Sequence, residues 1–151
     1  MDAIDVARYI VTKGVEMGYP VSNLKLQKLL YFVQGLCLSA FDKPAFEETI
    51  EAWQYGPAIP SVYFEFSLYG PLDINRSFQT EIEDKEIRGV VLFILNKFKD
   101  TEAFALVKET HREGSPWEQV YNKEDKHIKI PSNEIKKYFK EVYLREWFKN
   151  E

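Results

Sequence analysis

The sequence has one cysteine, Cys37, and two histidines, His111 and His127, among its 151 residues. A single cysteine excludes an internal disulfide and a zinc site built from several cysteines. Two histidines and one cysteine cannot close a zinc site without carboxylates, and no ligand spacing indicates one. We therefore expect no metal and no other cofactor.

Long hydrophobic runs and the common catalytic motifs are also missing. No apolar run reaches the roughly 18 residues of a membrane span, and the acidic start Met1–Asp5 lacks the basic region of a signal peptide. The chain carries no Gly-rich phosphate loop, no G-x-S-x-G elbow and no H-E-x-x-H motif. These absences predict a cytoplasmic protein that is not an enzyme and that binds no membrane.

Positive charge is not in excess. Lys and Arg number 20 against 24 Asp and Glu, so the formal net charge is −4. Residues 1–122 carry 12 basic and 18 acidic side chains, and residues 123–151 carry 8 and 6. Because non-specific nucleic-acid binding depends on Lys and Arg neutralising phosphates, this balance disfavours nucleic acid as a partner.

Apolar residues at helical spacing predict a first helix over 3–17, where Gly18 turns the chain. Ser22 is a candidate N-cap for a second helix over 23–41, whose apolar residues cover most of its circumference. Such a helix is typical of a buried, central position. Its one polar strip is narrow and holds Lys25, Lys28 and Ser39.

Shorter elements are predicted for the rest of the chain. Ser115 is a candidate N-cap in a capping box with Pro116 and Glu118. The other expected elements are a strand within 50–55 that ends at Gly56-Pro57, an aromatic helix at 60–69, a strand near 78–82, a helix at 84–99, a helix from a Thr101 cap to 110, a strand at 127–130, and a last helix at 133–149 capped by Ser132.

Together these elements predict a mainly α fold, or α+β with a minor β element. We expect a single-domain bundle of about six helices around the central helix 23–41, with a short β-hairpin or small antiparallel sheet. In the last helix, Leu144 and Phe148 lie roughly opposite the main apolar stripe. They belong either to a second side of the core or to an exposed patch for a partner.

Three side chains are candidates for chemistry. Cys37 lies on an apolar helix side and is expected to be a small buried hydrophobe. His111 follows a predicted helix, where a structural role at the helix C-terminus is favoured over a ligand contact or acid–base catalysis. Lys28 either snorkels to water or pairs with a carboxylate such as Glu51 or Glu65, and structural pairing is favoured over partner binding.

Aromatic residues are abundant, with 23 in the chain. Core packing is the expected role for each one, but Tyr and Trp also supply protein–protein hot spots. We do not expect the following clustered set to be fully buried, since each Tyr and Trp needs a polar partner. The cluster comprises Trp53, Tyr55, Tyr63, Phe64, Phe66 and Tyr69.

Three strings occur in an order that resembles a known family. They are Leu26-Gln27-Lys28-Leu29-Leu30-Tyr31-Phe32, Ala52-Trp53-Gln54-Tyr55-Gly56-Pro57, and Thr110-His111 followed by Ser115-Pro116-Trp117. Over roughly residues 3–122 the chain resembles the Panacea domain, or SocA-like, family, which includes phage-associated proteins of the GepA type. The resemblance implies that residues 1–151 form one such domain.

The resemblance also implies a function. Family members are antitoxins of two-gene toxin–antitoxin modules, often on phages or mobile elements, that act by contact with a toxin. A cognate protein toxin encoded next to this chain is therefore the expected partner. The partner-binding or motif candidates are Lys28, Tyr31, Trp53, Tyr55, Gly56, Pro57, His111 and Trp117, and they are candidates for specifying the fold as well.

Two alternatives remain open at this point. The first two predicted helices have the spacing of a helix-turn-helix, which would suit a nucleic-acid-binding regulator, although the second helix is too apolar to face a groove. A small hydrolase would use His111 with a carboxylate such as Glu109 or Glu118, and it would need a concave pocket around the histidine.

Overall fold

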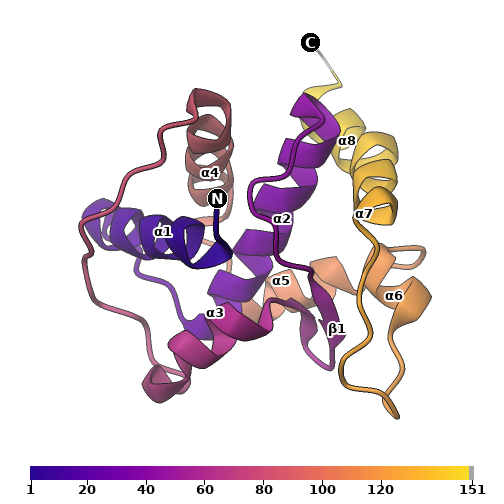
Figure 1. The fold of residues 1–151 in the computed structure, drawn as a ribbon, viewed down its shortest axis with the longest axis horizontal. Coiled ribbons are helices and arrows are strands. Elements are labelled where there is room, and N and C mark those ends of the chain that lie inside the picture. Colours follow the sequence, from indigo (N-terminus) through magenta and orange to yellow (C-terminus); the bar gives the residue numbers. More distant parts are fainter. Residues whose placement is uncertain (150–151) are drawn as a thin grey trace.

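The computed structural model describes residues 1–149 and shows a mainly helical chain built around one central helix. Helix α2 (Asn23–Phe41) runs through the middle, with α1 (Ala3–Met17) and α4 (Lys85–Phe98) on one side and α7 (Ser132–Tyr138) on the other (Figure 1). A two-stranded antiparallel sheet is the β element. The predicted fold class is confirmed.

Helix α2 is buried along almost its whole length because apolar side chains cover most of its surface. Ser22 caps it as predicted, since its Oγ accepts a hydrogen bond from the Lys25 N–H. The narrow polar strip is largely covered as well: Lys28 is 2% and Ser39 7% exposed. Other elements pack on that side as well, so these polar groups find partners inside the protein, as the Ser39 hydroxyl does at the Leu36 carbonyl.

Helix α1 ends as predicted at Gly18, which has φ +80° and turns the chain. Thr12 of this helix is buried although it is polar. The Thr12 hydroxyl accepts a hydrogen bond from the Phe78 N–H at 2.9 Å. A segment that lies far along the sequence therefore covers this side of α1.

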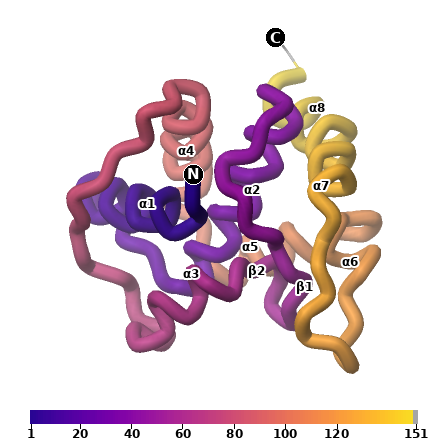
Figure 2. The backbone as a smooth tube through the Cα atoms, in the orientation of Figure 1, coloured from indigo at the N-terminus to yellow at the C-terminus, as the bar shows by residue number. Residues whose placement is uncertain are grey.

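That segment, residues 71–84, crosses the outside of the protein beside α1 (Figure 2). The strand predicted near 78–82 is wrong. The Ile74 N–H donates to the Val21 carbonyl at 2.7 Å, and Ile74 and Ile82 are buried anchors. Because its backbone groups bond to separate partners rather than to one neighbouring strand, the segment stays extended without joining a sheet.

The sheet is a hairpin of β1 (Glu51–Trp53) and β2 (Gly56–Ala58), with Trp53 opposite Gly56. The sequence predicted one strand that reaches residue 55 and ends at Gly56-Pro57. The chain instead turns at Gln54 and Tyr55, so that Gly56 and Pro57 belong to the second strand. Gly56 has φ +107°, a backbone conformation that favours glycine.

The strand predicted at 127–130 is reduced to a single bridge between Glu51 and Lys129. Two backbone hydrogen bonds of 2.8 Å flank this bridge, from the Ala52 N–H to the Ile128 carbonyl and from the Ile130 N–H to the Ile50 carbonyl. The hairpin is thus fastened on its β1 edge to a segment that follows it by more than 70 residues.

Short helices connect these parts. Helix α3 (Pro60–Glu65) and a 3₁₀ turn at Ser67–Tyr69 confirm the predicted aromatic helix. Helix α4 is capped by Asp84, whose side chain accepts from two backbone N–H groups. Helix α5 (Ala103–Thr110) starts after Glu102, so the predicted Thr101 cap is wrong.

Helix α6 (Pro116–Val120) confirms the capping box with a small shift. The Ser115 hydroxyl accepts from the Glu118 N–H at 3.2 Å. The Glu118 carboxylate reaches back to the Gly114 N–H at 2.8 Å instead of to the N–H of the cap residue itself. The backbone N–H groups of Gly114 and Glu118 at the start of α6 therefore both have acceptors.

The last helix differs from the prediction at its start and in its middle. Helix α7 begins at Ser132, which makes no side-chain cap, and Pro131 occupies the N-cap position. A π-helical segment at Phe139–Tyr143 then separates α7 from α8 (Leu144–Phe148). A π turn holds an additional residue and so rotates the side chains that follow it.

This rotation sets what the C-terminal helices bury. Phe139 and Tyr143 are both fully covered, and a Cβ at Gly35 of α2 would lie 2.3 Å from the Phe139 ring. Leu144 and Phe148 are partly buried against the core, which supports the second-side interpretation over an exposed patch. Among the helices of residues 1–149, none is both long and apolar enough to cross a membrane.

Candidate functional site

Lys28 lies beneath the β-hairpin. Its Nζ donates a hydrogen bond to the Pro57 carbonyl at 2.9 Å, which is a structural pairing. Within residues 1–149 no carboxylate accepts from it, so Glu51 and Glu65 are not the acceptors. Burial lowers the pKa of Lys28 to about 7. Glu65 pairs instead with Arg8 at 3.5 Å.

Glu51 organises the outer edge of the hairpin. Its Oε1 accepts from the Trp53 indole N–H at 2.9 Å and lies 3.0 Å from His127 Nδ1. These contacts hold the Trp53 ring, which packs edge to face on Tyr63 at 5.1 Å. A carboxylate that the sequence offered as a partner for Lys28 thus orients an aromatic side chain.

The backbone of Gly56 approaches two other elements closely. A Cβ at this position would lie 2.7 Å from Thr110 Oγ1 and 2.9 Å from Lys28 Cε. Thr110 belongs to α5 and Lys28 to α2, so the hairpin is wedged between these helices. Only glycine leaves room for this packing.

Trp117 supports the hairpin through a hydrogen bond, and His111 packs on Trp117. The Trp117 indole N–H donates to the Trp53 carbonyl at 2.6 Å. The His111 ring stacks on the Trp117 ring, with ring centroids 3.6 Å apart and planes inclined by 9°. Burial lowers the pKa of His111, and the nearby charge of Lys28 acts in the same direction. This geometry supports the structural role predicted for His111.

The two carboxylates that the hydrolase alternative requires, Glu109 and Glu118, are engaged with other groups. Glu109 accepts from Arg112 at 2.8 Å and from the Tyr143 hydroxyl at 2.7 Å. Glu118 accepts from the Gly114 N–H. His111 is not among the residues that line the cleft described below.

Tyr31 and Cys37 belong to the core. The Tyr31 ring is fully buried and packs edge to face on Phe32 at 5.4 Å and on Phe139 at 5.3 Å. Cys37 is also buried, and burial raises the pKa of its thiol to about 12. Of the predicted candidates, Tyr31 is therefore placed away from the surface.

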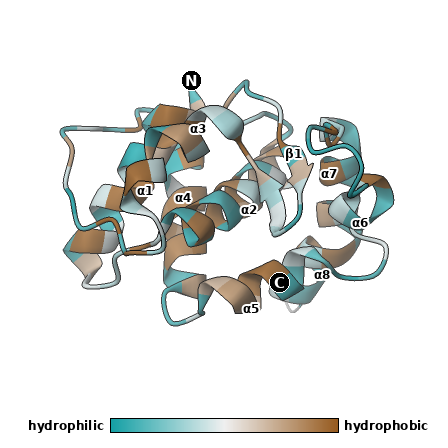
Figure 3. Cartoon of the chain, turned by 90° about the horizontal axis from the view of Figure 1, so that it is seen from below, coloured by the Kyte–Doolittle hydropathy of each residue, from teal (hydrophilic) through white to brown (hydrophobic). Residues whose placement is uncertain are grey.

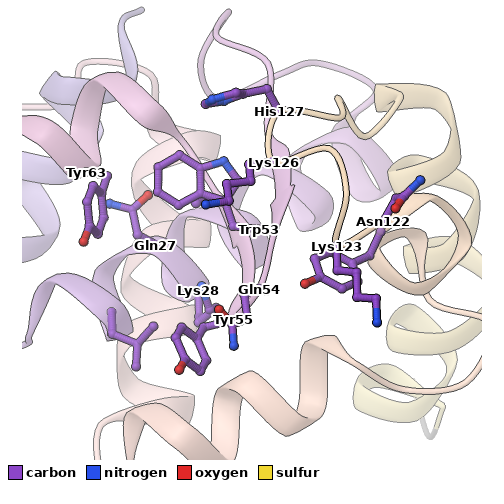
Figure 4. Close-up of a pocket in the computed structure, with 14 residues that line it drawn as sticks. Gln27, Lys28, Trp53, Gln54, Tyr55, Tyr63, Asn122, Lys123, Lys126 and His127 are labelled. Atoms are coloured by element: carbon purple, nitrogen blue, oxygen red, sulfur yellow. The ribbon is translucent and has the colours of Figure 1, made fainter.

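A cleft of about 570 Å³ opens in front of the hairpin. Figure 4 shows Trp53 and Tyr55 on one side and Asn122 and Lys123 of the following loop on the other. Lys28 lies at its base. The cleft residues used below are Gln27, Lys28, Trp53, Tyr55, Tyr63, Lys123, Lys126 and His127.

Exposed aromatic rings line this cleft or pack on residues that line it. Tyr55 is 51% exposed and packs edge to face on Phe104, which is 61% exposed. Helix α5, which carries Phe104, is coloured largely as hydrophobic in Figure 3. Tyr63 and Phe64 of α3 are exposed as well, whereas Phe66 is buried. The expectation that the aromatic cluster would not be fully buried is confirmed.

The structure brings most of the motif residues to one place. Lys28, Trp53, Tyr55 and Gly56 line the cleft, and the other three support the hairpin that forms its wall. The supporting residues are Pro57, His111 and Trp117. Within residues 1–149, no group of three or more His, Cys, Asp or Glu side chains is placed to hold a metal ion.

Sequence reasoning missed the far wall of the cleft. Lys123, Lys126 and His127 come from the loop that follows α6. The weak basic bias of residues 123–151 was the available sign. It did not locate the wall, because the bridge between Glu51 and Lys129 that places this loop beside the hairpin is a long-range contact.

The helix-turn-helix alternative has no support in this geometry. The second helix of the proposed pair is α2, which is buried on nearly every side. A recognition helix must present side chains to a DNA groove, so α2 cannot serve as one without unfolding the core.

Comparisons with known proteins agree with the motif resemblance. The family model described as "Antitoxin SocA-like, Panacea domain" matches residues 26–118. Antitoxin SocA of Caulobacter vibrioides (strain NA1000 / CB15N) is 34% identical over 134 residues, which covers 81% of this chain and 71% of the relative. No solved structure matches this chain.

Proposed function

This chain belongs to the SocA-like antitoxin family with a Panacea domain, and from that premise we propose that it neutralises a protein toxin by direct contact. The toxin would be the product of a neighbouring gene. The chain would act in the cytoplasm, without a cofactor and without catalysing a reaction.

The observation that carries this proposal is the set of exposed aromatic rings around the cleft. Tyr55, Phe64 and Phe104 are each more than half exposed. Aromatic side chains that stand together at a surface are typical of the energetic centre of protein–protein interfaces. The hairpin beneath them is held by Lys28 and Trp117, so this surface is rigid before a partner arrives.

Family membership also indicates two roles for the motif residues, support of the scaffold and contact with the toxin. Members that bind different toxins would need different contact residues on a shared scaffold. Gly56, Pro57, His111 and Trp117 support the hairpin, which suits a scaffold role. Tyr55 and Phe104 project from it and suit the contact role.

Growth of a bacterial host tests the proposal. The neighbouring gene is placed under an inducible promoter and expressed alone, with this chain, and with the destabilised variant Gly56→Ala. We expect its product to arrest growth alone and the intact chain to restore growth. A product that is harmless alone, or whose toxicity the intact chain leaves unchanged, would contradict the proposal.

A further inference from the structure

We propose that the cleft in front of the hairpin binds a short acidic segment of the partner protein that carries an apolar side chain. This inference rests on the proposed function for the identity of the partner. It adds the face that makes contact and the chemistry that this face selects.

The charge of the cleft points to an acidic occupant. Lys28, Lys123, Lys126 and His127 line it, and none of the lining residues within 1–149 is Asp or Glu. The chain as a whole has a net charge of −4. A cleft with cationic walls on an acidic protein attracts a carboxylate-bearing segment and repels a basic one.

Three carboxylates belong to the hairpin and the loop that line the cleft, Glu51 of β1 and Glu124 and Asp125 of the loop, and Glu51 is already engaged. Glu51 accepts from the Trp53 indole and contacts His127, and its side chain is 15% exposed. His127 is 72% exposed and stands at the rim. Glu51 is therefore taken up by Trp53 and His127, and Glu124 and Asp125, which stand between Lys123 and Lys126 in the sequence, are not among the lining residues.

Lys28 gives the base of the cleft unused hydrogen-bonding capacity. An ammonium group has three donors, and the structure assigns one of them to the Pro57 carbonyl at 2.9 Å. A carboxylate that enters the cleft would favour the charged form of Lys28, which burial otherwise disfavours. Deep binding of an acid is thus matched to an ammonium group whose acceptor among the described residues is a backbone carbonyl.

The apolar part of the occupant follows from the rings. Trp53 packs edge to face on Tyr63, and Tyr55 packs edge to face on Phe104. These two pairs flank the cleft and leave ring surface uncovered, since Tyr63 is 37% and Tyr55 51% exposed. An aromatic or aliphatic side chain between the acidic residues would bury this surface.

A nucleic-acid strand fits these observations less well. Binding through the phosphate backbone depends on Lys and Arg side chains that neutralise several phosphates, on the order of six to ten in a strongly salt-dependent complex. The cleft offers two exposed lysines, Lys123 and Lys126, on a chain of net negative charge. The volume of about 570 Å³ suits a few side chains of a peptide.

Synthetic peptides test the inference without any knowledge of the toxin. Three ten-residue peptides share the same Phe and Leu positions and carry only Glu, only Gln or only Lys between them. NMR titration of the folded chain measures their affinities. We expect the acidic peptide to bind at least about tenfold more tightly than the basic one, with the neutral peptide between them.

Two variants with the same change of charge locate the binding site. Lys123→Glu with Lys126→Glu alters the cleft, and Lys137→Glu with Lys140→Glu alters exposed lysines outside its lining. The cleft variant should weaken binding of the acidic peptide about tenfold and the control by less than about twofold. Circular dichroism checks that both variants remain folded.

The same variants separate this inference from the proposed function. In the growth assay, failure of the intact chain to restore growth counts against the proposed function. Restoration by the intact chain and equally by the cleft variant would overturn the cleft inference alone. Equal affinities for the three peptides, or tighter binding of an oligo-dT strand than of the acidic peptide, would also overturn it.

Discussion

Gly56 shows why a motif residue can be fixed by the fold. It combines a φ of +107° with a position where a Cβ would lie 2.7 Å from Thr110 Oγ1. Alanine would need both a strained backbone and a displaced neighbour, so we expect Gly56→Ala to lower the free energy of unfolding by about 3 kcal/mol. Chemical denaturation followed by tryptophan fluorescence measures this loss.

Gly114 provides the matched control. It has φ +80°, but a Cβ there would meet nothing within 4 Å. Gly114→Ala should therefore cost only the backbone strain, about 1–2 kcal/mol. If both variants lost the same stability, the close approach of the hairpin to α5 and α2 would not be what requires glycine.

Lys28 makes stability depend on pH. Its pKa is about 7 in the folded protein and about 10.4 in an unfolded chain. Between these values the unfolded state binds more protons, so the free energy of unfolding rises with pH, by up to about 1.4 kcal/mol per unit. Below about pH 7 both states are protonated and this contribution to the slope vanishes.

Substitution of Lys28 by methionine isolates this effect. Lys28→Met removes the titrating group while keeping a long, flexible side chain. We expect the rise in unfolding free energy between about pH 7.5 and 9.5 to become markedly smaller than in the parent chain. Lys137→Met, at an exposed position of α7, is the control. A slope unchanged by Lys28→Met would show that burial does not lower the pKa of Lys28 in the folded protein.

Among the elements, α6 depends on its cap. The Ser115 hydroxyl accepts from the Glu118 N–H and donates to the Thr110 carbonyl at 3.0 Å, and Ser115 is 1% exposed. Ser115→Ala removes both bonds, so we expect a loss of about 1–3 kcal/mol in the free energy of unfolding. Thermal and urea denaturation measure it.

Ser132 has the sequence position of a helix N-cap but does not act as one in the structure. It precedes a helix in the sequence just as Ser115 does, but α7 already begins at Ser132 and its side chain makes no capping bond. Ser132→Ala should change stability by less than about 0.5 kcal/mol. A loss as large as that of Ser115→Ala would contradict the assigned start of α7.

Local patterns predicted some elements well and others not at all. Helices α1 and α2 follow from apolar spacing and from Ser22 and Gly18, because these features act within a few residues. The π-helical segment at Phe139–Tyr143 was not predicted, and the close approach of Phe139 to Gly35 of α2 that accompanies it is a long-range contact. Periodicity along one helix does not contain that information.

The sequence likewise predicted one part of the candidate site and missed another. Its motif residues were found from the sequence, since Lys28, Trp53 and Tyr55 stand in recognisable strings. The acceptor of Lys28 was not, because it is the backbone carbonyl of Pro57. Backbone acceptors leave no trace in side-chain composition, whereas a carboxylate partner would have been visible as Asp or Glu.

On the scale of the whole molecule, we expect folding stability and toxin binding to depend on different aromatic residues. Phe32 and Phe139 lie in the core, while Tyr55 and Phe104 are more than half exposed. The double variant Tyr55→Ala with Phe104→Ala should keep the free energy of unfolding within about 1 kcal/mol of the parent. It should weaken the complex with the toxin at least about tenfold in titration calorimetry.

Leu92 of α4 serves as the control for that pair. It is 40% exposed and lies outside the cleft lining. Leu92→Ala should leave the affinity for the toxin unchanged. If it weakened the complex as much as the double variant did, the contact surface would lie on α4 rather than at the hairpin.

Direct contact without catalysis is tested most directly by the stoichiometry of neutralisation and by the mass of the recovered toxin. The purified toxin is titrated with this chain, its activity is followed, and the complex is then dissociated in denaturant for intact-mass measurement. We predict that inhibition saturates at a fixed molar ratio and that the toxin returns with unchanged mass and full activity after refolding. Complete inhibition by a small fraction of one equivalent, or a lasting change in the mass of the toxin, would contradict binding as the mechanism.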